Sequence, residues 1–215
     1  MLTLYNYWRS GPSYRVRIAL ALKGLAYRYV SVDLRAGAQG DPANAARNPQ
    51  RLAPTLELAD GTFLTQSPAI LEYLEEAYPA PALLPQAPEA RARVRAMGAL
   101  IACDIHPLHN LRVFQYLASA FGAEQPAQAA WARRWIEEGL EALEALAGQA
   151  PEGPFLWGEA PMLADCHLIP QLFSARRFGA ELARFPRLLA IEAAALAHPA
   201  FAAAHPARQP DAEPA

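Results

Sequence analysis

The sequence predicts a two-domain protein in which a small α/β domain precedes an all-helical domain. Short apolar runs, bounded by turn residues, alternate with helical patterns in the first 80 residues. A proline-rich stretch at 79–85 then interrupts the periodic patterns and is typical of a semi-rigid linker. Beyond it, apolar residues recur at helical spacing and alanine is abundant. We therefore expect one domain at 1–80 and a second at 88–215.

The first domain is expected to open with a β-α-β unit. Residues 2–7 predict a strand, and residues 27–34, with their alternating pattern, predict a second. Between them, residues 12–23 predict a helix that Gly24 closes. Two strands joined through such a helix are normally parallel.

An antiparallel pair and a second helix are expected to complete this domain. Residues 35–50 predict an irregular or short helical connection. A strand at 51–58, which includes Pro54, is followed by a hairpin turn into a strand at 62–65. A helix is then expected to run to about residue 78, with Ser67 as its capping residue.

The second domain is expected to contain helices only, because its strand signals are weaker than its helical periodicity. The predicted helices cover residues 89–121, 125–146, 163–177 and 186–196. Residues after His205 include Pro, Gln, Asp and Glu, and predict a loosely held tail.

Composition excludes several classes of function. The 215 residues carry a formal net charge of −2, which argues against a nucleic-acid partner. No apolar run is long enough for a transmembrane helix, and no secretion signal is recognised, so we expect a soluble cytoplasmic protein without a membrane partner. The two cysteines, Cys103 and Cys166, belong to no metal-ligand pattern and indicate reduced thiols and no metal site.

The start of the first helix is the strongest candidate for chemistry. Ser10 can cap this helix and Pro12 suits its first turn, because a proline lacks one of the N–H groups that a helix start leaves unpaired. The free N–H groups of such a start, together with a hydroxyl, can help to hold a thiolate. Two interpretations remain open on these residues alone: a well-capped helix, or an anion site.

Several stretches along the chain resemble the zeta class of the glutathione transferases, the maleylacetoacetate and maleylpyruvate isomerases. In chain order they are Ser10-Gly11-Pro12-Ser13-Tyr14-Arg15, Asn48-Pro49-Gln50, the strand with Pro54, residues 66–76, residues 103–110 and residues 164–171. The resemblance implies a thioredoxin-like first domain, an all-helical second domain, glutathione as cofactor and a homodimer. It also implies a maleyl diketo acid substrate from tyrosine or gentisate breakdown.

Two positions depart from the pattern of that class. Pro12 stands where the class carries a cysteine, and Gly11 replaces a second hydroxyl, which leaves Ser10 as the candidate that helps glutathione to ionise. Met162 stands where a Ser or Thr usually precedes Asp165 by three residues, so one cap hydrogen bond is expected to be lost.

The resemblance assigns the glutathione-binding residues. A cis Pro54 would leave the backbone of Ala53 free to pair with the ligand, although an ordinary edge-strand proline also fits this position. Gln66 and Ser67 would bind the γ-glutamyl carboxylate at a helix start, a role compatible with simple capping. Further expected contacts come from Gln39, Gln50, Asp104, His106 and Asn110, the first of these the weakest candidate.

Asp104 is expected to reach the ligand of a neighbouring subunit, although an isolated helical Asp is more often solvated. His106 and Asn110, four residues apart, are expected on one face of a helix, with packing at a helix irregularity as the alternative for His106.

Arginine suits a dicarboxylic substrate, because its planar fork pairs with carboxylates and stays charged. Arg9 is the first candidate, with a catalytic role beside Ser10, and Arg112 and Arg177 are the other substrate-binding candidates. Each arginine, taken alone, fits an ordinary surface position better than a binding site, because charged residues are mostly exposed.

The expected activity is glutathione-dependent cis–trans isomerisation of maleylacetoacetate or maleylpyruvate. Two alternatives remain: a general glutathione transferase or dehalogenating enzyme on the same scaffold, and a non-catalytic binding protein. The joint presence of Ser10, Ala53-Pro54, Gln66 and Ser67 argues against the non-catalytic alternative.

Overall fold

The computed structural model describes residues 1–213 and divides the chain into two compact units. The first unit contains residues 1–83 together with the segment from 196 onward, and the second contains residues 84–195. This division differs from the expected one, because the last segment of the chain groups with the first unit. No helix in the described part of the chain has the length and apolar character needed to cross a membrane.

A mixed four-stranded sheet organises the first unit. Its strands are β1 (Leu2–Asn6), β2 (Tyr27–Ser31), β3 (Thr55–Glu57) and β4 (Phe63–Thr65), in the order β2-β1-β3-β4. β1 and β2 are parallel, whereas β3 is antiparallel to both β1 and β4. The predicted β-α-β unit with an appended antiparallel pair is therefore confirmed. β3 is shorter than predicted and begins after Pro54, which has no N–H to donate to a ladder.

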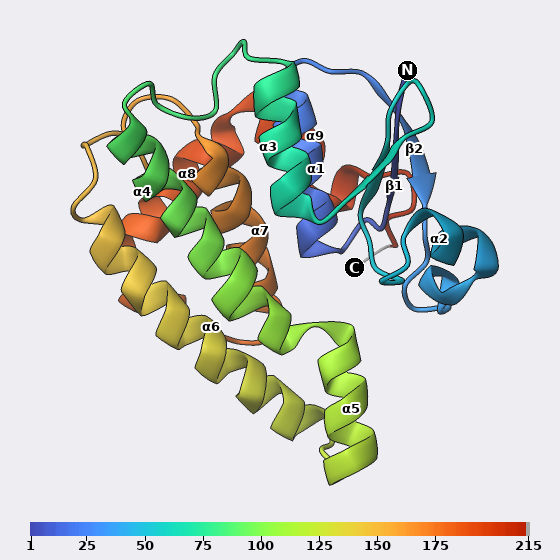
Figure 1. The fold of residues 1–215 in the computed structure, drawn as a ribbon. Coiled ribbons are helices and arrows are strands. Elements are labelled where there is room, and N and C mark those ends of the chain that lie inside the picture. The colour runs from blue at the N-terminus through green and yellow to red at the C-terminus, as the bar shows by residue number, and fades with distance from the viewer. Residues whose placement is uncertain (214–215) are drawn as a thin grey trace. The chain divides into compact units, whose positions relative to one another are not determined.

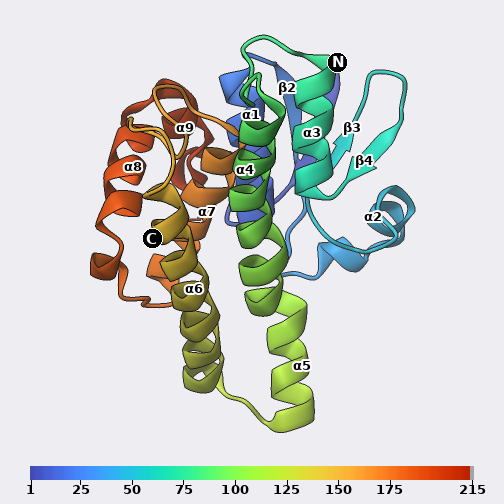
Figure 2. The same ribbon diagram turned by 60° about the vertical axis from the view of Figure 1, so that its left-hand side comes forward.

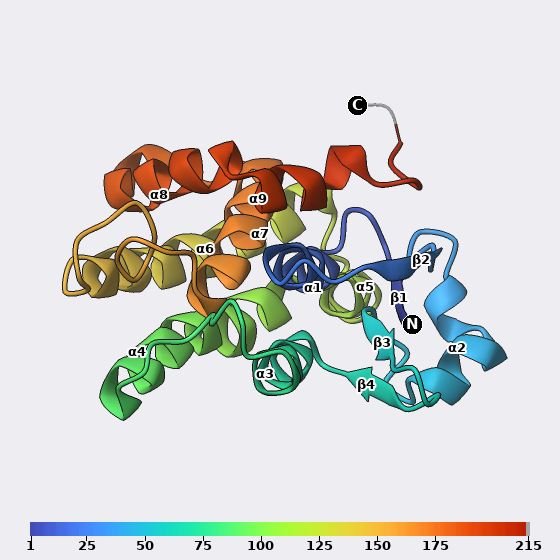
Figure 3. The same ribbon diagram turned by 90° about the horizontal axis from the view of Figure 1, so that it is seen from above.

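Helices of the first unit pack against one another around α1 (Gly11–Leu22). Figure 3 shows α1 between α3 (Ser67–Ala77) and α9 (Pro199–Ala204), and α3 also contacts β4, as Figure 2 illustrates. Most of α1 is buried, including Val16 and Ile18 at 0% exposure, which fits a helix covered on several sides. The short helix α2 (Pro42–Arg47) follows a 3₁₀ turn in the predicted irregular connection.

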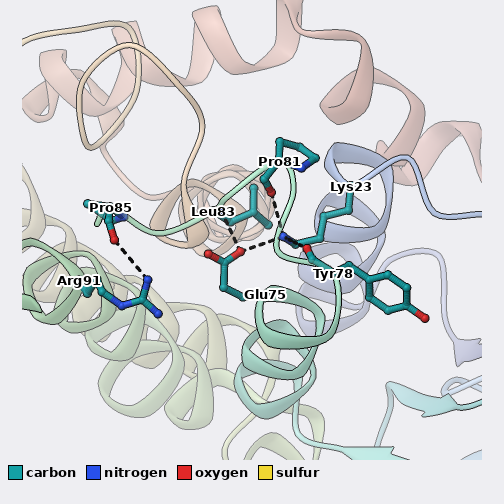
Figure 4. Close-up of polar contacts among 7 residues, drawn as sticks. All are labelled: Lys23, Glu75, Tyr78, Pro81, Leu83, Pro85 and Arg91. Carbon is teal, nitrogen blue, oxygen red and sulfur yellow. Dashed lines mark hydrogen bonds and ion pairs between the residues drawn. The ribbon is translucent and has the colours of Figure 1, made fainter. Parts of the chain in front are cut away.

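A buried polar cluster holds residues 78–83, the last segment before the chain enters the second unit (Figure 4). Lys23 Nζ donates to Glu75 Oε2 at 2.8 Å, to the carbonyl of Tyr78 at 2.7 Å and to that of Pro81 at 2.9 Å. The backbone N–H of Leu83 donates to the same carboxylate oxygen at 2.9 Å. The lysine is therefore both paired and hydrogen-bonded, as a buried charge requires.

The second unit is helical, as predicted. Its helices are α4 (Pro88–Ala99), α5 (Leu111–Phe121), α6 (Gln125–Ala147), α7 (Leu163–Arg177) and α8 (Pro186–Ala197), of which α8 extends into the last segment (Figure 1). Apart from one isolated bridge between Phe155 and Gly158, no β-pairing occurs among its described residues. α4 packs on α7, and the Trp131 indole N–H of α6 donates to the Leu108 carbonyl at 2.7 Å.

The prediction of one continuous helix over 89–121 is wrong. After α4 the chain forms a π-helical turn at Leu100–Ile105 and a 3₁₀ turn at His106–His109. Pro107 cannot donate a helical hydrogen bond, and Asn110 is extended at φ −75° and ψ 151°, where it caps α5. His106 and Asn110 therefore do not share one helix face.

The expectation of a loosely held tail after His205 is also wrong for residues 206–213, whereas residues 214–215 lie outside the described part of the chain. Residues 199–204 form α9, which sequence periodicity did not indicate, and a 3₁₀ turn follows at Pro206–Arg208. The side-chain amide of Gln209 donates to the carbonyls of Ala203 at 3.0 Å and His205 at 2.9 Å. Asp211, two residues later, accepts three further hydrogen bonds, from Trp8, Tyr29 and Ser31.

Candidate functional site

Ser10 lies at the carboxyl end of β1, where the chain turns into α1. It is the N-cap residue of that helix, and its Oγ accepts a hydrogen bond from the Ser13 N–H at 3.3 Å. Its own N–H donates to the Tyr7 carbonyl at 3.1 Å. The predicted cap is thus confirmed. Because Oγ acts as an acceptor within the cap, the hydroxyl proton is directed elsewhere and can be donated to an anion.

Gln66 has an unusual backbone conformation at the start of α3. It occupies the N-cap position with φ 66° and ψ 108°, a region that costs of the order of 1–3 kcal/mol for a residue with a side chain. Its Nε2 donates to Gln50 Oε1 at 2.6 Å. Two predicted site residues from separate segments are therefore brought together. Strained backbone of this kind concentrates at ligand-binding positions.

Ser67 is not the N-cap residue that the sequence predicted. It is the first residue of α3 because Gln66 takes the cap position. The Ser67 side chain is buried, with 3% of the residue exposed, and its Oγ accepts a hydrogen bond from Arg15 Nη1 at 3.3 Å. Arg15 belongs to α1, the helix that begins beside Ser10. This contact links the two predicted helix starts through a buried cation.

The Ala53–Pro54 peptide bond is cis, as the resemblance implied. Pro54 is buried and directly precedes β3, whereas Ala53 is half-buried and lies outside the sheet. Among the described residues, no hydrogen bond engages the backbone N–H or C=O of Ala53. Both groups therefore have the capacity to pair with an extended ligand, in the manner of an added strand.

Gln39 has a buried amide oxygen that finds no partner among the described residues. It lies in the 3₁₀ turn before α2, and its backbone carbonyl accepts from Asn44 Nδ2 at 3.0 Å. A buried polar atom without a partner is uncommon in a folded protein, and a ligand donor would satisfy it.

Arg9 lies in the same loop as Ser10 and is half-buried. Its guanidinium carbon is 5.5 Å from the centre of the Trp8 ring. Among residues 1–213, no carboxylate forms an ion pair with Arg9. An arginine with this freedom keeps its capacity for a substrate carboxylate.

The second unit carries the remaining predicted residues. Asp104 is exposed in the π-helical turn, and the Asn110 side chain accepts from the Arg112 N–H at 3.0 Å as it caps α5. The Arg112 side chain is exposed and forms no ion pair with the described carboxylates. Asn110 therefore contributes to the helix start beside Arg112.

An aromatic cluster brings His106 and Arg177 to the same part of the second unit. The rings of His106 and His109 are 5.1 Å apart between centres, and those of His109 and Phe178 are 5.5 Å apart. The Arg177 guanidinium lies 4.6 Å from the centre of the Phe178 ring. By contrast the neighbouring residue Arg176 is paired with the buried Glu192.

At the start of α7, Asp165 accepts hydrogen bonds from backbone N–H groups, but the cap hydrogen bond of a Ser or Thr hydroxyl is absent. Its carboxylate accepts from the N–H groups of Leu156 and Met162, each at 2.8 Å, while Met162 supplies no hydroxyl. Burial raises the pKa of Asp165 to about 6, and the two backbone hydrogen bonds oppose that rise. The described residues offer no group of three or more metal-ligating side chains, and neither Cys103 nor Cys166 forms a disulfide.

Known protein families match parts of both units. The family profile described as "Glutathione S-transferase, N-terminal domain" matches residues 4–82, and "Glutathione S-transferase, C-terminal domain" matches residues 129–194. A maleylpyruvate isomerase from Ralstonia is 48% identical over 98% of this chain and 99% of its own. A maleylacetoacetate isomerase from Pseudomonas aeruginosa is 49% identical over 98% of each chain.

The chain belongs to the glutathione transferase family.

Solved structures place this glutathione transferase near the zeta class. A holo maleylpyruvate isomerase, described as a bacterial zeta-class glutathione transferase, aligns with a TM-score of 0.96 at 48% identity, covering 98% of this chain and 100% of its own. A maleylacetoacetate isomerase from Anaeromyxobacter dehalogenans, with glutathione bound in its active site, aligns with a TM-score of 0.90 at 47% identity, covering 99% of this chain and 98% of its own. The thioredoxin-like first domain and helical second domain implied by the resemblance are confirmed.

Sequence reasoning missed Arg15 as a neighbour of this glutathione transferase's site. A signal was present: Arg15 and Arg17 interrupt an otherwise apolar helix, yet both are buried, at 2% and 1% exposure. Charged residues in a buried helix require partners, so their positions point to polar groups nearby. For Arg15 one such partner is Ser67.

Proposed function

We propose that this chain catalyses the glutathione-dependent cis–trans isomerisation of a maleyl diketo acid, either maleylacetoacetate or maleylpyruvate. The observation that carries the proposal is the combination of a zeta-class scaffold with a polar cradle at its first unit. That cradle comprises the Ser10 cap, the unused backbone groups of Ala53 and the Gln50–Gln66 pair.

These residues fit glutathione by their chemistry. Ala53 offers one N–H and one C=O to the peptide-like middle of the ligand. The N-terminal end of α3, at Gln66 and Ser67, offers backbone N–H groups to a carboxylate. The buried amide oxygen of Gln39 offers an acceptor for a ligand N–H. His106, Asn110 and, across a dimer, Asp104 are further proposed contacts.

When bound, glutathione would supply a thiolate nucleophile for reversible addition to the substrate double bond, which allows rotation once that bond is single. The task of Ser10 is to donate its hydroxyl proton as a hydrogen bond to the sulfur, which favours the ionised form. The positive end of the α1 dipole acts in the same direction. No protein nucleophile is needed, which is consistent with Pro12 at the position of the class cysteine.

Arginines bind the two substrate carboxylates in this proposal. Arg9 lies beside Ser10 in the β1–α1 loop, whereas Arg112 and Arg177 come from α5 and α7 of the second unit. A guanidinium pairs with a carboxylate through two parallel hydrogen bonds and also stabilises negative charge that develops on the diketo group.

We also propose that the protein is a cytoplasmic homodimer of aromatic-compound breakdown. Glutathione is a thiol of the reducing cytosol, which fits two free cysteines. Exposed Asp104 would contact the ligand of the partner subunit. Mass measurement in solution tests the dimer, which predicts about twice the 23.4 kDa of one chain.

A rate comparison on the two acids tests the activity and identifies the substrate. Purified protein is assayed with maleylacetoacetate and with maleylpyruvate, each with and without glutathione. We expect rapid isomerisation of at least one acid, only when glutathione is present. Failure to isomerise either acid, combined with conjugation of a neutral chlorinated aromatic, would instead assign a general transferase.

A further inference from the structure

The C-terminal segment reaches the loop that carries Ser10. Asp211 Oδ2 accepts from the backbone N–H of Trp8 at 3.2 Å and from Ser31 Oγ at 2.7 Å. Its other oxygen accepts from the Tyr29 hydroxyl. The carboxylate therefore connects the end of β2 with the loop after β1. Trp8 is two residues before Ser10.

A buried cation holds the other side of the same peptide segment. Arg17 Nη2 donates to the Trp8 carbonyl at 2.8 Å, and Nη1 donates to the Tyr7 carbonyl at 3.3 Å. Both backbone polar groups of Trp8 are thus bonded to charged side chains. Hydrogen bonds to a charged group are stronger than neutral ones, so these contacts hold the loop from two sides.

Arg17 is itself connected to the C-terminal segment. Its Nε donates to the carbonyl of Ala204, at the end of α9, at 3.1 Å. Of the two side chains that hold the Trp8 peptide, Asp211 belongs to the segment after residue 196 and Arg17 is bonded to it. This segment lies outside both matched family profiles, which end at residues 82 and 194. The arrangement therefore depends on C-terminal residues that neither family profile describes.

The groups around Asp211 remain hydrogen-bond donors because they keep their protons. Burial, and then the hydrogen bond to Asp211, raise the pKa of Tyr29 above its ordinary value, so its hydroxyl keeps the proton that it donates. Three donors surround the half-buried carboxylate, whereas Glu213 on the same segment pairs with the exposed Arg35. Asp211 and Glu213 thus form a natural comparison.

We infer that Asp211 is a positioning residue, which fixes the Trp8 peptide and thereby the placement of the Ser10 hydroxyl against the glutathione sulfur. This inference rests on the proposed function in one respect, the role of Ser10. Because the effect is exerted on the sulfur, it predicts a change in the ionisation of bound glutathione. A tail that only stabilised the fold would leave that ionisation unchanged.

The test compares Asp211→Ala, Asp211→Asn and the control Glu213→Ala with the parent protein. Ultraviolet absorbance of bound glutathione is titrated against pH, and kcat and the KM for glutathione are measured separately. We expect Asp211→Ala to raise the pH at which the bound thiol ionises by about one unit. We also expect a fall in kcat of about ten-fold, because misplacement of a reacting group by about 1 Å costs up to about a hundred-fold.

The other variants separate positioning from general stability. Asp211→Asn keeps an acceptor oxygen for the Trp8 N–H, so its titration should lie between those of Asp211→Ala and the parent. Glu213→Ala should match the parent in titration and kcat. If Asp211→Ala fails to fold, Tyr29→Phe, which removes one donor from the carboxylate, should shift the titration in the same direction by a smaller amount.

Two results would overturn the inference: an unchanged titration in folded Asp211→Ala, or an equal shift in Glu213→Ala. In the case that Asp211→Ala does not fold, an unchanged titration in Tyr29→Phe overturns it. Absence of isomerase activity in the parent would count against the proposed function alone, since the thiol titration still decides the role of Asp211.

Discussion

Ser10 has two separable tasks, to cap α1 and to stabilise a thiolate. Loss of its Oγ removes the hydrogen bond from Ser13 N–H, at a cost of about 1 kcal/mol for Ser10→Ala. Glycine is a better N-cap than alanine, so Ser10→Gly should retain most of this stability. Both variants lack the hydroxyl, and we expect both to lower kcat and to shift the titration of bound glutathione upward.

Denaturant unfolding and thiol titration, measured on the same two variants, separate these tasks. The assignment of Ser10 to thiolate stabilisation would be wrong if kcat followed stability, with Ser10→Gly close to the parent and Ser10→Ala impaired.

The arginines distinguish an isomerase from a general transferase, because a diketo diacid carries a charge at each end whereas a chlorinated aromatic carries none. We expect Arg9→Ala, Arg112→Ala and Arg177→Ala each to lower isomerase kcat/KM by about ten-fold to a hundred-fold, as a charge-assisted contact of roughly 1.5–3 kcal/mol is lost. Conjugation of the neutral aromatic should change far less.

Arg134→Ala is the matched control for these arginines. Arg134 lies exposed on α6, where it faces Glu138 at 3.8 Å, and surface pairs of this kind contribute little. Both activities of Arg134→Ala should equal those of the parent. A parallel loss of both activities in the three test variants would assign those arginines to glutathione binding or folding.

At the scale of elements, the close approach of α6 to the π-helical turn leads to a stability prediction. A Cβ added at Gly139 would lie 2.3 Å from Cγ1 and 2.4 Å from Cδ1 of Ile105, which is 1% exposed. Alanine would otherwise favour the helix by about 1 kcal/mol. Overpacking should dominate, and Gly139→Ala should lower the free energy of unfolding by about 1–3 kcal/mol.

A double variant identifies the cause of that loss. Ile105→Ala removes both clashing atoms but leaves a cavity, and the combined variant lets the new Cβ occupy part of it. Denaturant unfolding should therefore show a smaller loss for the pair than the sum of the two single losses. Strict additivity would mean that the contact with Ile105 is not responsible.

The start of α7 predicts a pH dependence of stability. Burial raises the pKa of Asp165 to about 6 in the folded state, above the ordinary value of 3.8. The folded state therefore binds this proton more tightly than the unfolded state. The contribution of Asp165 to stability is greatest below pH 3.8 and declines, by about 3 kcal/mol in total, as the pH rises to about 6.

Asp165→Asn removes this titration and provides the reference. The difference in unfolding free energy, parent minus Asp165→Asn, should fall between about pH 4 and pH 6 and then stay level. An increase of that difference with pH would mean that the carboxyl has a lowered pKa in the folded state.

Capping and periodicity rules were sufficient to predict the boundaries of helices that adjacent residues determine. Ser10 and Pro12 mark the start of α1, and α7 begins and ends at the predicted residues, Leu163 and Arg177. The break between α4 and α5 was missed, because a π turn hardly alters the spacing of apolar residues. The position of Ser67 was also misassigned, since the positive φ that places Gln66 at the N-cap has no local sequence signature.

At the scale of the whole molecule, the sequence did not predict the ordered C-terminal segment, because its contacts join residues that are distant in the chain. Asp211 meets Trp8 across 203 positions and Tyr29 across 182, so no local pattern could reveal an ordered C-terminal segment. The resemblance, by contrast, predicted the family and glutathione, because it used motifs in one order along the chain. The roles of individual site residues remain predictions.

Counting how much glutathione is consumed per product tests the central claim most directly. An isomerase returns glutathione after each cycle, whereas a transferase retains it in the product. With a large excess of the maleyl acid over glutathione, we predict complete conversion to the trans acid while the free thiol stays at its initial concentration. Conversion that stops after one equivalent of glutathione, with loss of the free thiol, would contradict the account.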